Sequence, residues 1–302
     1  MSTQHNMVWL AVTAALVSAA FLALGTQRQA AAVRNAHGRE VSGRQILEML
    51  KNRTWLIGLF LMITGVVLNV VALSLAPLTV VQPLGAVALV LTTIINSWDR
   101  KIRINGATWR AITVCTIGAI GFVLLAIKAT HETFVTGNQR VLIIILLGIS
   151  SLILAILALV HRRHKGGAIF YIVGAGILFG FTAVLVRTIA VTFLHWDPEM
   201  TWWKQVPWGA MIAIVIVGIM GQYFNQHAYA SGPPELVVAG LTVIDPMVGV
   251  LIGVIILGEL MPGLPWYIAL GMIAAGVIAI IGVLQLSRHH PDSVAPERTE
   301  VR

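Results

Sequence analysis

Charged residues are scarce in this chain. Asp, Glu, Lys and Arg make up only 11% of its 302 residues, whereas a soluble domain carries roughly 25%. The apolar residues, 58% of the total, gather in continuous blocks of about 20, the length of helix that crosses the hydrocarbon core of a bilayer. Because the blocks are continuous rather than alternating, they favour helices over the strands of a barrel. The sequence therefore excludes an ordinary soluble domain and predicts an all-α polytopic membrane protein.

Cysteine and catalytic motifs are also scarce. Cys115 is the only cysteine and lies inside an apolar block, which excludes an internal disulfide and a cysteine-based metal site. The chain has no HExxH, GxSxG, Walker A or GxGxxG motif. We therefore expect neither an enzyme nor a bound cofactor. The basic pI near 10.3 reflects cationic loops and does not require a nucleic-acid partner.

Nine spans are expected from the apolar blocks. The first is expected to be a helix that is retained and not a cleaved signal peptide. The polar residues before it carry no positive charge, and the basic residues follow the apolar run. The nine spans cover residues 7–25, 54–75, 77–97, 107–127, 140–160, 168–192, 208–227, 236–257 and 266–286.

Lys and Arg set the expected orientation. Fifteen of them lie in one set of loops, and only Lys128, Arg140 and Lys204 lie in the opposite set. Cytoplasmic loops carry the excess of positive charge, so we expect the N-terminus outside, the C-terminus inside and a location in the cytoplasmic membrane. In the first basic loop, Ser42–Gln45 resembles a capping box and indicates a short helix on the inner surface. The lipid bilayer is thus the expected partner, and a homodimer stays open.

One segment of the sequence occurs a second time in similar form. Ser74–Leu84 resembles Ser231–Leu241, which lies 157 residues later, and the match continues to Trp109 and Trp266. The offset pairs the third span with the eighth and the fourth with the ninth. Since the partners are offset by five places in the order of the spans, an odd number, the two halves have opposite orientations, as in transporters built from inverted repeats.

The repeat divides the chain into unequal halves. Residues 1–165 would form a first helical repeat of five spans and residues 166–287 a second of four. The polar residues 288–302 are expected to be a disordered cytoplasmic tail. A rival register matches Leu78–Pro83 with Leu241–Pro246. Its offset differs by six residues from that of the first register, but it pairs the same two helices.

Several short motifs carry a family resemblance. A first group of motifs consists of Ala228–Pro234, Val237–Val238, Asp245–Pro246 and Leu257–Glu259. A second group consists of Gly58–Met62, Ala76–Pro77, Val81–Ala86 and Phe181–Arg187. The former group resembles the drug/metabolite transporter (DMT) superfamily of EamA-like proteins, and the latter resembles its NIPA-type magnesium transporter branch. The resemblance implies a secondary transporter that works by alternating access between inverted halves. The tenth helix of the superfamily is missing here, and Ser97–Asp99 stands where a first-half Gly-Glu would lie.

Asp245 is the deepest carboxylate, near the middle of the eighth span, and Pro246 follows it. A central Asp costs about 2.5–3.5 kcal/mol on insertion scales, and transporter sites are built at broken helices near the midplane. We therefore expect Asp245 in the substrate pathway, where it releases and rebinds a proton, and we expect helix breaks at Pro77, Pro83 and Pro246. The alternative is a hydrogen-bonded Asp245 that holds a kink together.

Five amides are expected to line the same pathway. Gln222, Asn225 and Gln226 share one face of the seventh span, because they are spaced i, i+3 and i+4. Asn69 and Gln82 lie in the first half at the opposite depth, as inversion predicts. The alternative is that these amides join helices by hydrogen bonds worth about 0.6 kcal/mol each.

Arg187 is the one basic residue well inside a span, and by helical rise its height is closest to that of Glu259. The two side chains could form a gate at the outer end of the pathway. The alternative is that Arg187 extends to the membrane surface. Two Gly-xxx-Gly pairs, Gly176–Gly180 and Gly249–Gly253, indicate close helix packing rather than substrate contacts.

Two classes of substrate fit these residues. Mg²⁺ takes oxygen ligands and is usually held by one or two carboxylates together with several waters, but Asp245 is the only central carboxylate. Glu235 and Glu259 lie at opposite ends of the same span, and Arg187 would repel a dication. We therefore rank a small organic metabolite or amphiphile first, and a NIPA-like Mg²⁺ transporter with the ion at Asp245 second.

The orientation predicts which loops are accessible from outside. The loops around Arg44, Arg100 and Arg163 should face the cytoplasm, and residues 193–207 should face outward, because the positive charges lie in the first set. Cysteines introduced into each loop and labelled in intact cells check this. External labelling of the Arg100 loop would contradict the orientation.

Overall fold

The computed structural model of the protein describes residues 2–35, 52–99, 104–131, 133, 135–161, 167–196, 201–232 and 234–288. The elements are α1 (Ser2–Asn35), α3 (Arg53–Leu75), α4 (Leu78–Val81), η1 (Gln82–Leu84), α5 (Gly85–Asp99), α6 (Gly106–Ala129), α7 (Gly137–His161), α8 (Ala168–Leu194), α9 (Trp202–Gln205), α10 (Trp208–Ser231), α11 (Pro234–Ile255) and α12 (Trp266–Arg288). The short helix expected at Ser42–Gln45 and the tail after Arg288 lie outside the described residues.

Nine helices within the described residues are long and apolar enough to cross a membrane. Their bounds follow the nine predicted spans to within a few residues, from Asn6–Gln29 to Trp266–Leu286. The all-helical prediction is therefore confirmed. Length and hydropathy were sufficient for this, because a lipid environment leaves the backbone few other ways to satisfy its hydrogen bonds.

The third span is assembled from three pieces. Ala76 is extended, with φ −146° and ψ 160°, as expected for a residue before a proline, and α4 begins directly after Pro77. Pro83 has no N–H to donate to the carbonyl of Thr79, and the chain there forms the 3₁₀ turn η1 before α5 resumes. The interruptions expected at Pro77 and Pro83 are both present.

The break expected at Pro246 is absent, because α11 runs continuously from Pro234 to Ile255 with Pro246 inside it. Pro246 removes only the hydrogen bond that the carbonyl of Thr242 would accept. Transmembrane helices tolerate such a loss when neighbouring helices hold the backbone in place. Here α8 packs closely against the same stretch of α11, because a Cβ added at Gly176 or Gly180 would lie 2.6 Å from Ile244 or Val248.

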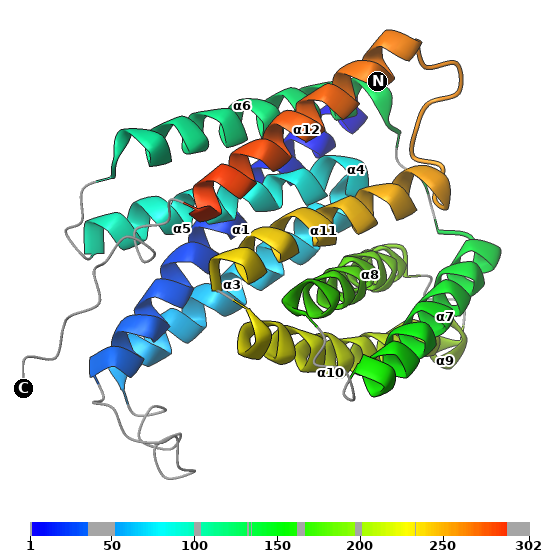
Figure 1. Ribbon diagram of the computed structural model, residues 1–302. Coiled ribbons are helices and arrows are strands. Elements are labelled where there is room, and N and C mark those ends of the chain that lie inside the picture. Colours follow the sequence, from blue (N-terminus) through cyan, green and yellow to red (C-terminus); the bar gives the residue numbers. More distant parts are fainter. Residues whose placement is uncertain are drawn as a thin grey trace, which may run out of the picture.

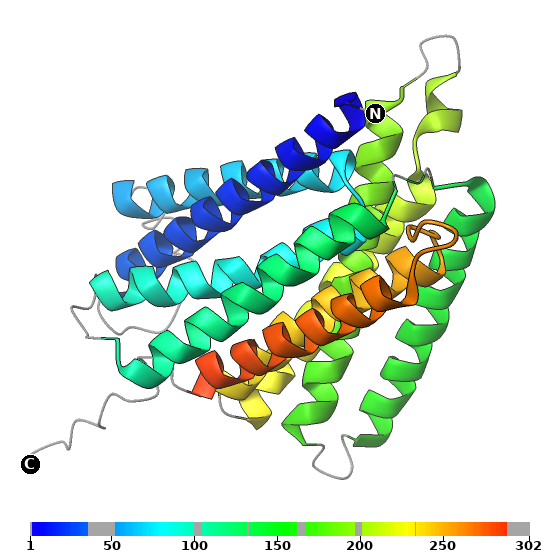
Figure 2. The same cartoon turned by 90° about the horizontal axis from the view of Figure 1, so that it is seen from above.

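Most of the long helices pack in pairs (Figures 1 and 2). Helix α1 packs along α3, α8 packs along α10, and α6 packs along α12. Helix α11 lies against α8 and also meets α4 and η1, while α7 lies at the edge against α8 and α10. These pairs join the first and second spans, the sixth and seventh, and the fourth and ninth, as a two-fold repeat requires. The inverted relation of the halves and the orientation of the termini stay predictions.

One end of the bundle holds most of the connections that matter for the site. There α3 turns into α4 through Ala76 and Pro77, and Thr130, which follows α6, meets Leu260, which follows α11, through an isolated bridge. We call this the hairpin end, and the distribution of Lys and Arg predicts that it faces outside.

The contact between α6 and α12 predicts a sharp packing effect. A Cβ added at Gly282 would lie 2.3 Å from the backbone N of Cys115, whereas one added at Gly148 meets nothing within 4 Å. Gly282→Ala should therefore destabilise the protein by about 1–3 kcal/mol through overpacking, and Gly148→Ala should not. Thermal unfolding in detergent checks this. Equal melting temperatures for the two variants would contradict the close approach of α6 and α12.

Candidate transport cavity and its ion-pair cluster

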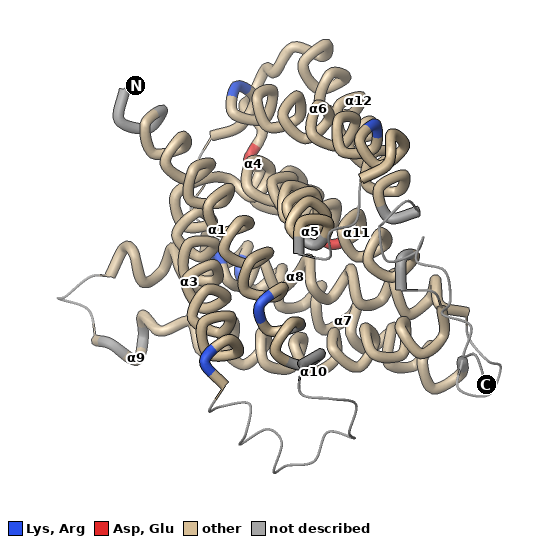
Figure 3. The backbone as a smooth tube through the Cα atoms, turned by 90° about the vertical axis from the view of Figure 1, so that its left-hand side faces the viewer, with Lys and Arg blue, Asp and Glu red and all other residues tan. Residues whose placement is uncertain are grey.

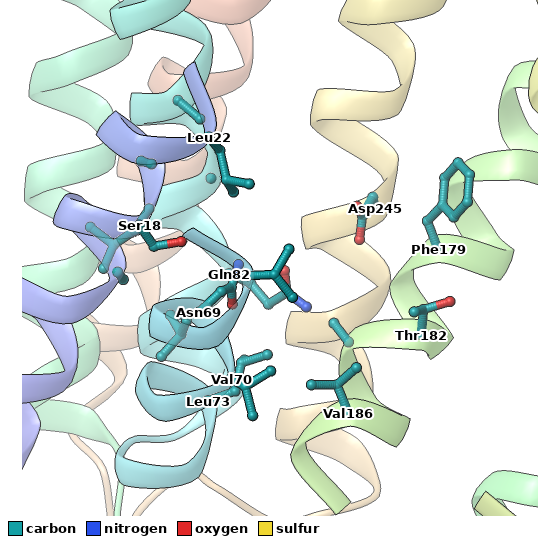
Figure 4. Close-up of a pocket in the computed structure, with 18 residues that line it drawn as sticks. Ser18, Leu22, Asn69, Val70, Leu73, Gln82, Phe179, Thr182, Val186 and Asp245 are labelled. Carbon is teal, nitrogen blue, oxygen red and sulfur yellow. The ribbon is translucent and has the colours of Figure 1, made fainter. Parts of the chain in front are cut away.

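A cavity of about 350 Å³ lies between the first-half helices and α8, and Asp245 of α11 reaches into it. Figure 4 shows Asn69 and Gln82 on one side and Asp245 on the other. Its polar lining residues are Ser18, Asn69, Gln82, Thr182 and Asp245, and its larger apolar ones are Leu22, Val66, Val70, Leu73, Val81, Leu84, Phe179 and Val186. Polar groups from both predicted halves thus meet in one space.

Asp245 is positioned by the close contact of α8 with α11. A Cβ at Gly180 would lie 2.6 Å from Val248 and 2.9 Å from the carbonyl oxygen of Asp245, and a Cβ at Gly176 would lie 2.6 Å from Ile244. Gly176 and Gly180 are therefore packing residues, as expected. Within the described part of the chain, no hydrogen bond or ion pair reaches the Asp245 carboxylate, so it is available to a ligand.

Gln82 lies in the 3₁₀ turn η1, where its side chain rests on α11. A Cβ at Gly249 would lie 2.5 Å from the Nε2 atom of Gln82, so Gly249 makes the room for this amide. The Nε2 atom is buried and has no hydrogen-bond partner among the described residues. By contrast, the Oγ of Ser18 donates to the carbonyl of Gly65 at 2.7 Å. Gln82 is thus more available to a ligand than Ser18.

The three amides of α10 do not line this cavity. Gln222 and Gln226 are exposed, and Asn225 Nδ2 donates to Gln222 Oε1 at 3.2 Å. Their spacing puts them on one face, and the exposure of Gln222 and Gln226 places most of that face outside the helix packing. A Cβ at Gly221 would lie 2.8 Å from Phe179, which lines the cavity. The expected grouping of Asp245 with Asn69 and Gln82 is found, and its grouping with the α10 amides is not.

Glu259 is completely buried, at 0% exposure, directly after α11. Its Oε1 accepts the backbone N–H of Leu78 at 2.8 Å, and its Oε2 accepts the N–H and the hydroxyl of Thr79 at 2.9 and 2.6 Å. The first N–H groups of a helix have no partner inside the helix, and α4 begins at Leu78. Glu259 therefore satisfies the start of the third span from a distant part of the chain.

Arg187 completes the cluster from α8. Its Nη1 lies 3.1 Å from Glu259 Oε1 and donates to the carbonyl of Ala76 at 2.6 Å, and its Nη2 donates to the carbonyl of Thr133 at 3.4 Å. The residue is only 3% exposed, so it does not extend to the membrane surface. The ion pair that the heights of Arg187 and Glu259 indicated is present, and Figure 3 shows acidic positions inside the bundle beside α4 and α11.

The turn after α11 aims Glu259 back into the protein. Gly258 has a φ of +67°, which other residues rarely adopt, and the N–H of Glu259 donates to the carbonyl of Gly253 at 3.0 Å. A Cβ at Gly253 would lie 2.5 Å from Glu259 Oε2. Sequence reasoning missed the role of Thr79 here. The signal for it was Pro77, because a helix that begins after a proline inside a membrane needs an acceptor for its first N–H groups.

Comparisons with known proteins point to one family. The family model described as magnesium transporter NIPA matches residues 3–195. A Corynebacterium glutamicum protein described as uncharacterized is 24% identical over 94% of this chain and 96% of its own length. The probable magnesium transporter NIPA9 of Arabidopsis thaliana is 26% identical over 82% of this chain and 75% of its own length. Human magnesium transporter NIPA4 is 27% identical over 47% of this chain but only 37% of its own length. No solved structure gives a significant match.

The two intramembrane carboxylates should differ in their effect on stability. Glu259→Gln should destabilise the fold by about 3–5 kcal/mol, because it leaves the buried Arg187 without its counter-charge. Asp245→Asn should change stability by less than about 1 kcal/mol, because no described residue is bound to the carboxylate and would lose a contact. Thermal unfolding in detergent compares the two variants. A larger loss from Asp245→Asn would contradict this assignment.

Proposed function

The chain belongs to the magnesium transporter NIPA family, and we propose that it carries Mg²⁺ across the membrane through the cavity beside Asp245. The observation that carries the proposal is a carboxylate that has no partner among the described residues and faces a cavity with amide side chains in the middle of the bundle. The named relatives are transporters rather than enzymes, in keeping with a chain that has no catalytic motif.

The cavity suits a partly hydrated Mg²⁺ ion. Mg²⁺ keeps several of its waters and takes one or two carboxylates rather than an all-protein cage. The described residues hold no cluster of three or more His, Cys, Asp or Glu, so any ion here must rely on water and amide oxygens besides Asp245. Six waters at about 30 Å³ each occupy about half of the 350 Å³ available. Asn69 and Gln82 can contact those waters with their side-chain oxygens.

Arg187 does not oppose a dication in this arrangement. Its charge is paired with Glu259 at 3.1 Å, and Arg187 is not among the cavity-lining residues. The repulsion that ranked Mg²⁺ second in the sequence analysis is thereby removed. Asp245 is then the main charge facing the cavity, and its sign favours cations.

An organic solute is the second candidate. The cavity wall is largely apolar, with Leu22, Val70, Leu73 and Phe179 among its members, and ligand pockets for organic molecules are mostly apolar. The names of the relatives favour Mg²⁺ over the small organic metabolite that the sequence analysis ranked first. We further propose alternating access between the two halves, in the cytoplasmic membrane and with the hairpin end outside.

Mg²⁺ flux through Asp245 is the direct prediction of this proposal. Asp245→Asn should lower Mg²⁺ uptake into reconstituted vesicles by about tenfold or more, and Gln82→Ala by a smaller factor, because charged contacts contribute more than neutral ones. Gln226→Ala is the control and should stay within about twofold, since this residue lies outside the cavity. Uptake is followed with an entrapped Mg²⁺-sensitive dye and normalised to folded protein.

Two outcomes would count against Mg²⁺ as the substrate. Uptake that is equal in Asp245→Asn and the unmodified protein would remove Asp245 from the pathway. No Mg²⁺ uptake by folded protein, together with pH-driven accumulation of organic amphiphiles that Asp245→Asn abolishes, would establish the second candidate instead.

A further inference from the structure

One continuous segment of buried residues lies between the cavity and the hairpin end. Leu73 and Val81 line the cavity, and the chain between them turns back through Ala76 and Pro77. Every residue from Ala76 to Val81 is buried, and Leu78, Thr79 and Val80 are at 0% exposure. This segment, Leu73–Val81, is called the end segment. A solute that moves between the cavity and the hairpin end would pass this segment.

The end segment is held in place by side chains from the second half. Glu259 accepts both N–H groups at the start of α4, and Arg187 donates to the carbonyl of Ala76 just before it. The two groups also pair with each other at 3.1 Å. The backbone around Glu259 is itself held, because the N–H of His131 donates to the Glu259 carbonyl at 2.9 Å. The closed end thus depends on one ion pair that joins the two halves.

A pivot lies at the other end of the same short helix. Pro83 leaves the carbonyl of Thr79 without its helical donor, and η1 separates the four residues of α4 from α5. Gly85 follows directly, and a Cβ added there would meet nothing within 4 Å. Gly85 has helical angles, φ −57° and ψ −29°, so packing does not require a glycine at this position. A glycine there makes bending easier, because it has more backbone freedom than alanine.

We propose that the Arg187–Glu259 pair is the latch of a gate, in which the end segment swings away from the hairpin end about the turn Gln82–Gly85 and opens the cavity to that side. The proposal rests on the proposed function only in taking the cavity as the transport path. Its test measures access to the cavity and does not depend on which solute is carried.

An ion pair suits a latch better than a permanent seal. A buried ion pair is often no more stabilising than well-packed apolar residues of the same volume, because both charges lose their hydration. Apolar side chains would therefore close this end equally well. Charges differ in that they regain hydration when the end opens to water, which lowers the free energy of the open state. Breaking the ion pair while the gate stays closed costs free energy, because both charges would then be buried without a partner. The closed state is therefore also well defined.

The same movement would respond to an ion bound in the cavity. Gln82 belongs to the turn that we assign as the pivot, and its buried Nε2 and side-chain oxygen lie beside the cavity opposite Asp245 (Figure 4). Only two residues separate it from Thr79, which the latch holds. An ion with waters bound between Gln82 and Asp245 would pull on one end of α4, while Glu259 holds the other.

Access to the cavity from the hairpin end tests the latch. In a Cys115→Ala background, Ala183→Cys places a thiol on the cavity wall, and a membrane-impermeant maleimide is added on the hairpin side of oriented vesicles. We expect slow labelling when the latch is intact, and labelling about tenfold faster with Glu259→Gln or Arg187→Gln. Thr79→Val, which removes one hydrogen bond to Glu259, should accelerate labelling about threefold.

Two controls separate gating from loss of structure. Thr201→Cys, an exposed position in the segment between α8 and α10, should label at the same rate in every variant. Gly85→Ala, which stiffens the pivot without touching the latch, should slow the labelling of Ala183→Cys severalfold. Because Thr79→Val and Gly85→Ala are mild changes, the test remains available if Glu259→Gln or Arg187→Gln does not fold.

The labelling rates decide the proposal. Rates for Ala183→Cys that are unchanged in folded Thr79→Val and Gly85→Ala protein would overturn it, as would rates that rise only in step with the loss of folded protein. The pair would then be a fixed structural contact. Faster labelling without Mg²⁺ uptake would keep the gate and refute Mg²⁺ as the substrate. Mg²⁺ uptake without any change in labelling would refute the gate and leave Mg²⁺ as the substrate.

Discussion

A carboxylate that has no access to water must find its donors within the protein, and the hairpin end of this molecule is built around that requirement at Glu259. Two backbone N–H groups and one hydroxyl of the third span, together with Arg187 of α8, surround its two oxygens. The positive φ of Gly258 and the absence of a side chain at Gly253 place it there. If Glu259 were removed, the start of α4 would be left with unsatisfied donors in a lipid environment, where such groups cost several kcal/mol.

Asp245 has the opposite surroundings, although it lies on the same stretch of chain. It faces a cavity, and no described residue donates to its carboxylate or pairs with it. The two acidic groups thus differ in their contacts, since Glu259 binds the start of α4 at the hairpin end and Asp245 offers a negative charge in the middle of the bundle. Gln82 connects them, because it lies in the cavity wall and in the same interrupted span that Glu259 holds. This connection makes the third span the element through which binding and closure can influence each other.

The elements and part of the site could be predicted from the sequence, and the reason differs in each case. The nine spans follow from apolar blocks of membrane length, and the interruption at Pro83 follows from a missing N–H. Asp245, Asn69 and Gln82 meet because each is a polar group deep in a different span. The α10 amides were grouped with them wrongly, because helical spacing defines a shared face but does not determine which neighbour that face meets. The continuity of α11 through Pro246 depends on packing by α8, which local sequence does not reveal.

The central claim is that a partly hydrated dication binds between Asp245 and the amides of the first half. The most direct measurement is the position of Mn²⁺, a divalent ion of similar ligand preference, located by its anomalous scattering in crystals grown at saturating concentration. The account predicts a peak inside the cavity, within reach of the Asp245 carboxylate directly or through one water, which disappears in Asp245→Asn. A peak at another place in the bundle that persists in Asp245→Asn would contradict it.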